Sequence, residues 1–306
     1  MPIPASDLHR WIASSEEARS SLNHERIRQN VISFEGIRNA KIPNYEIDTC
    51  DMLVFMHIPK NGGTTLRRLI SRNVSPTLIA SVNEDALTHN PYLCWHLGRP
   101  LPCILGHHDT SGIVYQFVLR PMLHITMLRE PVDRAVSYYN YTMQRRQSGL
   151  ARGREDASFS EFFREPEAER IRNNQARFLL GRDLSAIDET EAIRESKRIL
   201  KDSFSLFGLV ERYSLFLLML SKTIGWKDLF YKNRNVSHKT ITKSSLAKDN
   251  LELIKSHNRI DLALYAYANQ LFDQRLESLG ICDADEDRFD HLNEKYKSLV
   301  SESVSG

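Results

Sequence analysis

Residues 52–70 constrain the fold more than any other part of this 306-residue chain. Residues 52–58 read MLVFMHI, a continuous apolar run typical of a strand that is buried on both faces of a parallel sheet. A turn follows, Pro59-Lys60-Asn61-Gly62-Gly63, and an amphipathic helix then opens at Thr64. A strand, a glycine turn and a helix in this order form half of a βαβ unit. We therefore predict an α/β fold with a central parallel sheet flanked by helices.

Further apolar segments extend this prediction. Met122–Leu128 (MLHITML) indicates a second buried strand, and Pro131 suits the first turn of a helix over Val132–Arg146. A further strand is predicted at Leu206–Val210, and Pro102–Leu105 forms a short apolar piece that ends in Gly106-His107-His108-Asp109. The remaining helices are predicted over Ser158–Leu180, Glu189–Asp202, Ser214–Ile224 and, as one or two helices, Ala247–Gly280.

The chain divides into three parts by composition. Residues 1–48 are polar with proline at both ends, and we interpret them as an N-terminal extension. Residues 49–282 are long enough to form one large α/β domain. Residues 283–306 are charged and then serine-rich, which predicts a frayed polar C-terminal tail.

Charge and hydropathy exclude several classes of protein. The 41 basic and 39 acidic residues give a net charge of +2, which argues against a partner that is nucleic acid. No apolar run approaches the length of about 20 residues that spans a membrane, and the first residues lack a signal-peptide pattern. We expect no transmembrane segment and a cytoplasmic protein. The four cysteines form no CxxC pair, so we predict no metal site.

The glycine turn predicts a phosphate site. Gly62 and Gly63 allow the backbone to approach a ligand closely, and the helix that opens at Thr64 turns free N–H groups and its positive dipole end toward the turn. Lys60 precedes the glycines, whereas the lysine of a Walker A loop follows them. A lysine there can reach the bridging oxygen between two transferable groups without a metal ion. The alternative is a strand-to-helix turn that binds nothing.

A second candidate site lies at Arg129. This residue follows a buried strand, at the edge where ligands bind in open α/β sheets, and Ser137 lies two helical turns further on. A guanidinium and a hydroxyl together suit a phosphate dianion. Alternatively, Arg129 pairs with Glu130 or Asp133 at the start of the helix.

These two motifs carry a resemblance to a known family. HIPKNGGTT at residues 57–65 and REPVDRAVSYY at residues 129–139 resemble the cofactor-binding motifs of sulfotransferases that use 3′-phosphoadenosine 5′-phosphosulfate (PAPS). The resemblance is nearest to the branch of the heparan and uronyl 2-O-sulfotransferases and their bacterial relatives. Residues 174–179, 208–213 and 261–265 also look like signatures of this family. The resemblance implies a P-loop-like three-layer fold and a sulfotransferase domain over residues 49–282.

The resemblance also implies roles for single residues. The 5′-phosphosulfate would be held by Lys60, Asn61, Gly62, Gly63, Thr64 and Thr65, with Lys60 stabilising the leaving phosphate. Arg129 and Ser137 would bind the 3′-phosphate, and no metal would be needed. The polar segment Asn233–Lys243 lies where the family closes a loop over the nucleotide.

Sulfuryl transfer to an alcohol requires a base for the hydroxyl proton, and histidine titrates in the useful range. The family carries a histidine after glycine between its two motifs, which makes His107 the candidate base and His108 the reserve. In the alternative interpretation both are ordinary structural histidines. We expect His57, just before the loop, to be structural.

The acceptor is a hydroxyl, and the donor motifs suit a glycan, a lipid, a small alcohol or a peptide tyrosine equally. Four arginines around residues 145–154 could bind an anionic glycan or belong to a solvated loop: Arg145, Arg146, Arg152 and Arg154. Two other functions compete, a magnesium-dependent phosphotransferase and a non-catalytic nucleotide-binding module. The sequence carries no signal for an oligomeric state.

Overall fold

The computed structural model describes residues 52–74, 79–83, 103–107, 122–147, 158–231 and 241–302. The predicted N-terminal extension, residues 1–48, lies outside the described residues. His108 and residues 233–240 of the polar segment also lie outside them.

Five strands form one sheet in the order β2-β3-β1-β4-β5, and every neighbouring pair is parallel. Their bounds are β1 Met52–Met56, β2 Ile79–Asn83, β3 Cys103–His107, β4 Met122–Leu128 and β5 Leu206–Leu209. From β1 the chain builds β2 and β3 on one side and then crosses to place β4 and β5 on the other. The strand order therefore reverses at β1 and β4, whose carboxyl ends form the crevice where α/β sheets bind ligands.

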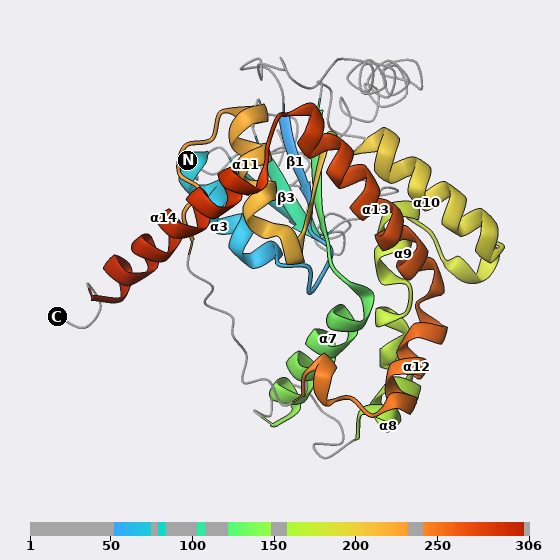
Figure 1. Cartoon of the computed structure of the whole chain (residues 1–306). Helices are drawn as coiled ribbons and strands as arrows, with labels where there is room; N and C mark the ends of the chain where they lie inside the picture. The colour runs from blue at the N-terminus through green and yellow to red at the C-terminus, as the bar shows by residue number, and fades with distance from the viewer. Residues whose placement is uncertain are drawn as a thin grey trace, which may run out of the picture.

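Helices cover both faces of this sheet (Figure 1). On one face lie α3 (Gly63–Asn73), α11 (Tyr213–Ile224) and α14 (Asp283–Glu302). On the other lie α9 (Asn174–Leu180), α10 (Glu189–Ser203) and α13 (Arg259–Ser278). The predicted α/β fold with a parallel central sheet between helical layers is confirmed.

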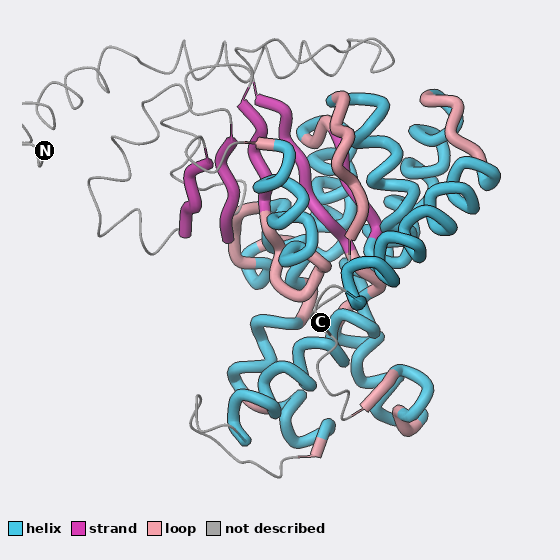
Figure 2. Tube along the Cα trace, turned by 90° about the vertical axis from the view of Figure 1, so that its left-hand side faces the viewer, coloured by secondary structure: helices cyan, strands magenta, loops and turns pink. Residues whose placement is uncertain are grey.

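A helical lobe continues beyond the carboxyl ends of the strands (Figure 2). It consists of α7 (Pro131–Gln147), α8 (Phe159–Arg164), η3 (Pro166–Ile171) and α12 (Lys248–His257). The lobe has its own hydrophobic core, built around Tyr139, Phe162 and Ile254. Because α7 begins directly after β4, it connects this lobe to the sheet.

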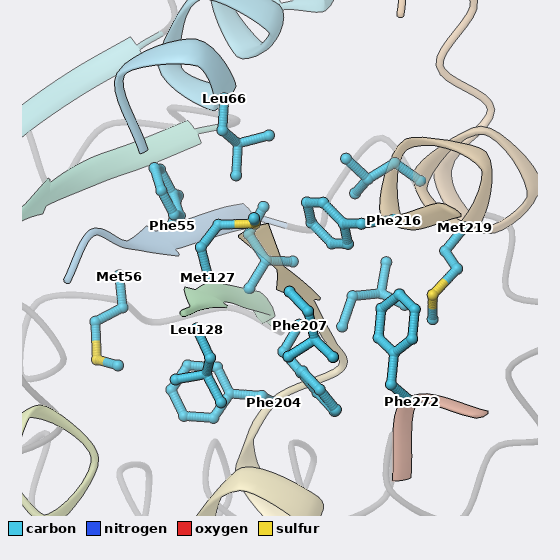
Figure 3. Packing of buried hydrophobic residues seen from close by; sticks show 14 of the residues in the cluster. Phe55, Met56, Leu66, Met127, Leu128, Phe204, Phe207, Phe216, Met219 and Phe272 are labelled. Atoms are coloured by element: carbon cyan, nitrogen blue, oxygen red, sulfur yellow. The ribbon is translucent and has the colours of Figure 1, made fainter. Parts of the chain in front are cut away.

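The main core lies on both sides of the sheet (Figure 3). Met127 and Phe216 pack so closely on β5 that a Cβ atom at Gly208 would lie 2.4 Å from the sulfur of Met127 and 2.6 Å from the ring of Phe216. A glycine is therefore required in this strand. Short 3-10 helices complete the described elements, η4 at Leu184–Ala186, η5 at Val210–Arg212 and η6 at Lys243–Ser245.

Two predictions of secondary structure need correction. The single helix expected over Ser158–Leu180 is divided into α8, η3 and α9. Pro166 lacks the N–H group that would continue α8, and the left-handed backbone of Asn173, with φ 45°, separates η3 from α9. Strand β2 was not predicted, since its five residues, IASVN, form too short a pattern to stand out. Ala247–Gly280 contains two helices, α12 and α13, which meet at Asn258.

The expectation of a frayed tail is wrong over Asp283–Glu302, which forms α14. Phe289 is buried and its ring stacks on Phe230 with 5.6 Å between centroids. Asn293 is also buried, and its side-chain oxygen accepts a hydrogen bond of 2.8 Å from the backbone N–H of Tyr231. One face of this charged segment is therefore part of the packed structure.

Candidate active site

The loop after β1 adopts left-handed backbone at two positions. Gly62 has φ +70° and caps α3, whereas Lys60 has φ 70° although it carries a side chain. Such a conformation is uncommon for a residue other than glycine and requires support from its surroundings. For Lys60, that support includes a hydrogen bond of 3.2 Å from Nη1 of Arg129 to its carbonyl oxygen.

The second glycine is required by the packing of a histidine. A Cβ atom at Gly63 would lie 2.1 Å from Cδ2 of His57. His57 stacks on Phe55 with 5.5 Å between ring centroids, and its backbone N–H donates a hydrogen bond of 2.8 Å to the carbonyl of Gly106. His57 therefore packs against the loop at Gly63 and fixes its shape, as expected of a structural residue.

Helix α3 begins without a side-chain cap and without an acidic residue in its first turn. Thr65 donates its backbone N–H to the carbonyl oxygen of Gly62 over 3.2 Å. Thr64 is exposed and Thr65 is half-buried at this helix start. An uncapped helix start with no acidic residue in its first turn favours an anion, because the N–H groups and the helix dipole both present positive charge.

Asn61 fastens the loop to the rest of the domain. Its side chain is fully buried, and its Nδ2 donates hydrogen bonds of 2.8 Å both to the carbonyl of Met127 and to Oε1 of Gln175. The amide donors are thus occupied within the protein, so the side chain of Asn61 shapes the loop.

Gln175 joins the loop to the second motif. Its Oε1 accepts the backbone N–H of Arg129 at 2.8 Å, and its Nε2 donates to the carbonyl of Arg129 at 2.9 Å. Asp261 in turn accepts the backbone N–H groups of Gln175 and Ala176, at 3.1 Å and 2.8 Å, at the start of α9. The segments at residues 174–179 and 261–265 therefore support the loop after β1 and the backbone of Arg129. The sequence had assigned no role to Gln175 or Asp261.

Arg129, at the carboxyl edge of the sheet, has a hydrogen-bond donor that is not used. Its Nε is buried and has no hydrogen-bond partner among the described residues. No ion pair joins it to Glu130 or Asp133 in the same part of the chain; Glu130 binds Lys243 at 2.9 Å instead. Because a buried N–H group without a partner is costly, this guanidinium fits a ligand that brings anionic oxygen.

The site has an excess of positive charge. Burial, and then the neighbouring cations Arg129 and Arg134, lower the pKa of Lys60 to about 8. Arg134 is 1% exposed, and burial lowers its pKa to about 10, a shift that the charge of Asp261 opposes. Burial raises the pKa of Asp261 in turn, and the charge of Arg134 opposes that shift. Lys60, Arg129 and Arg134 are therefore close enough for their charges to act on one another, and of these three cations only Arg134 interacts with the buried carboxyl group of Asp261. Such a group of cations favours an anion.

Tyr141 was not predicted as part of the site. Its ring, on α7, has its centroid 4.3 Å from Nζ of Lys60. The signal available in the sequence was spacing, since Tyr141 lies four residues after Ser137 on the same helix and so shares its face.

The remaining predicted residues have different outcomes. His107 is the last residue of β3, so its backbone lies at the same carboxyl edge as the loop, while His108 is outside the described residues. Ser137 is half-buried on α7, and no hydrogen bond joins it to Arg129 within the part of the chain that the structure describes. The role of Ser137 at the 3′-phosphate stays a prediction.

The arginines proposed for an anionic acceptor divide into two groups. Arg145 and Arg146 lie within α7 and not in a loop. Arg146 is buried, with its Nη2 at 2.6 Å from Oε2 of Glu165, so this guanidinium is part of the helical lobe. Arg152 and Arg154 lie outside the described residues.

The end of the polar segment is bound to the middle of α7 and to Glu130 just before this helix. Asn140 and Ile241 exchange two hydrogen bonds, from Nδ2 to the carbonyl at 2.8 Å and from the backbone N–H to Oδ1 at 3.1 Å. Lys243 lies 2.9 Å from Oε2 of Glu130. The described end of the segment Asn233–Lys243 is therefore next to the second motif.

Within the described ranges, no cluster of three or more histidine, cysteine, aspartate or glutamate side chains could hold a metal ion. In the same part of the chain, the helices are too short or too polar to cross a bilayer.

Comparison with known proteins gives a consistent result. The chain is 24% identical over 281 residues to heparan-sulfate 6-O-sulfotransferase 1 of Cricetulus griseus, which covers 74% of this chain and 68% of the relative. It is 22% identical over 318 residues to heparan-sulfate 6-O-sulfotransferase 1-B of Danio rerio, covering 86% and 76%. Heparan-sulfate 6-O-sulfotransferase 1 of Mus musculus is 24% identical, and the match covers 74% of this chain and 67% of the relative. No family model matches the chain.

These relatives are named 6-O-sulfotransferases, whereas the motifs had pointed to the 2-O branch of the heparan-modifying enzymes. The identity is low, but the match is repeated and extends over most of the chain. The predicted resemblance is confirmed at this level, and the chain is an enzyme related to the PAPS-dependent sulfotransferases.

Proposed function

We propose that this protein transfers a sulfuryl group from PAPS to a hydroxyl group of a glycan. The observation that carries the proposal is the joint placement of Lys60 and Arg129. They come from two different motifs, at the carboxyl ends of β1 and β4, and a hydrogen bond of 3.2 Å links them directly.

The residues fit a donor with phosphate at both ends. The buried Nε of Arg129 lacks a partner among the described residues, which suits an oxygen of the 3′-phosphate. The uncapped start of α3, with Gly62 and Gly63 before it, suits the 5′-phosphosulfate. Thr64 and Thr65 add hydroxyl donors at the same helix start.

Bound there, PAPS would supply the sulfuryl group: the acceptor oxygen forms a bond to sulfur while the bond from sulfur to the 5′-phosphate oxygen breaks, releasing 3′-phosphoadenosine 5′-phosphate (PAP). Lys60 and the N–H groups of α3 stabilise the negative charge that grows on the departing phosphate. The network of Asn61, Gln175 and Asp261 holds these groups in place before the donor binds, so little reorganisation is needed.

His107 accepts the proton of the acceptor hydroxyl in this proposal. Its support is position, since β3 ends at His107 beside β1 and on the same edge as Lys60. His108 remains the reserve. In this proposal the reaction needs no metal ion. Lys60 precedes the glycines, and its ammonium group neutralises the charge of the leaving phosphate as a metal ion would.

A glycan is favoured as the acceptor because the relatives named above are heparan-sulfate sulfotransferases. The test is a transfer assay with ³⁵S-labelled PAPS and a panel of unsulfated and partly sulfated glycosaminoglycans, with a simple alcohol as comparison. Label should enter a glycan without added magnesium, and the K60A and R129A variants should lose the activity. A parallel assay with ATP labelled with ³²P in its γ-phosphate and with magnesium tests the phosphotransferase alternative, which transfer of ³²P alone would support. PAP binding in calorimetry without any transfer would support the non-catalytic module.

A further inference from the structure

Tyr141 contacts the lysine of the phosphate loop from a different part of the fold. Nζ of Lys60 lies 4.3 Å from the centroid of the Tyr141 ring, within the range of a cation–π interaction. The ring is 39% exposed, so burial in the core does not explain its position. Its hydroxyl accepts a hydrogen bond of 2.8 Å from Nη1 of Arg145, one turn further along α7.

Apart from the ring of Tyr141, the surroundings of Lys60 offer little that favours a charged ammonium group. Burial opposes the charge, and the groups that face it with full charge are the guanidinium groups of Arg129 and Arg134. No carboxylate lies within ion-pair distance of its Nζ in the part of the chain that the structure describes. The negative face of an aromatic ring supplies part of the missing stabilisation without placing an anion where the donor binds.

The main chain of Lys60 is fixed, whereas the position of its ammonium group depends on the contacts of the side chain. Its φ of 70° and the hydrogen bond from Arg129 fix the main chain at this residue. The four-carbon side chain is otherwise flexible, and its ammonium group can be placed by whatever contacts its end. The contact that the structure provides is the ring of Tyr141.

We propose that Tyr141 is a positioning residue for Lys60, and that its ring face holds the ammonium group at the phosphate loop before the donor binds. This inference rests on the proposed function, in which Lys60 acts on the leaving phosphate. Ser137, Tyr141 and Arg145 are spaced by four residues, so one face of α7 carries the predicted phosphate ligand, the ring and the residue that fixes the ring hydroxyl.

The test measures the protonation of Lys60 in the ligand-free protein. The rate at which acetic anhydride labels Lys60 is followed by mass spectrometry of its peptide between pH 6 and 10.5, and the midpoint gives the pKa of this lysine. Y141L and Y141Q remove the aromatic face, whereas Y141F keeps it and removes only the hydroxyl. Arg129 and Arg134 are unchanged in all three.

Loss of the ring should lower the midpoint by about 0.4 to 1.5 pH units, the equivalent of a typical cation–π interaction. Y141F should keep the wild-type midpoint, and a purely structural role for Tyr141 would not produce this pattern. The inference is overturned if Y141L and Y141Q, folded by circular dichroism, keep the wild-type midpoint, or if Y141F shifts as far as they do. If one of the two variants does not fold, the other gives the answer.

The labelling experiment needs no donor, so it separates the two proposals. A PAP titration of the wild-type protein in parallel tests the proposed function. If PAP does not bind but the midpoints shift as expected, the contact is real and the sulfotransferase assignment fails. If PAP binds and the midpoints do not shift, the assignment stands and Tyr141 is not the positioning residue.

Discussion

The affinity of the protein for PAP should fall about tenfold between pH 7 and pH 9 because Lys60 loses its proton over this range. The structure lowers the pKa of Lys60 to about 8, first through burial and then through Arg129 and Arg134. An anion bound beside Lys60 favours the ammonium form, so binding raises this pKa and takes up a proton. The affinity for PAP is therefore highest below pH 7, and it decreases as the pH rises through the pKa of Lys60 in the free protein.

The magnitude follows from the fraction of protein with a charged Lys60. With a pKa near 8, about nine-tenths of the molecules carry the proton at pH 7 and about one-tenth at pH 9. If only the protonated form binds well, the ratio is roughly tenfold, or about 1.4 kcal/mol. The phosphates of PAP contribute little to this change, since the second pKa of a phosphate monoester is about 6.

Isothermal titration calorimetry at several pH values gives the affinity. Titrations in buffers of different ionisation enthalpy at pH 8.5 also count the protons taken up. The matched control is K60R, whose guanidinium stays charged throughout, so its affinity should not depend on pH between 7 and 9. The reasoning is refuted if the wild-type affinity is flat over this range, or if K60A and K60R show the same decrease as the wild type.

Three further predictions concern single residues. R129A should weaken PAP binding by at least about 1.5–3 kcal/mol, the typical value of a charged hydrogen bond, and unchanged affinity in calorimetry would remove this residue from the 3′-phosphate site. H107A should keep its affinity for PAP while kcat for transfer falls by roughly 10²–10⁴; if H108A shows this loss instead, the reserve histidine is the base. G63A should lower the free energy of unfolding by about 1–3 kcal/mol through its clash with His57. Thermal or urea unfolding should show a much smaller cost of G63A in an H57A background, and an equal cost in both backgrounds would contradict the packing account.

The sequence predicted the parts of the site that local patterns determine. The apolar run over β1, the two glycines and the start of α3 lie within a short segment, so strand, turn and helix could be located together. Arg129 was found in the same way, because a buried strand ends directly before it. These local patterns also fixed the order of strands and helices well enough to give the fold class.

Contacts between distant segments could not be predicted. Asn61 and Gln175 are separated by 114 residues, and their amide hydrogen bond exists only because α9 packs under the loop. The contact of Tyr141 with Lys60 likewise depends on the direction in which α7 leaves β4. In α14, the many acidic residues conceal an apolar face whose packing partner, Phe230, lies far away in the sequence.

The most direct test of the central claim is a titration of the purified protein with PAP, with adenosine 5′-phosphate and with ATP plus magnesium in parallel. The account predicts tight binding of PAP without a metal ion, and a large loss of affinity when the 3′-phosphate is absent. Equal affinity for PAP and adenosine 5′-phosphate, or a preference for ATP with magnesium, would contradict it.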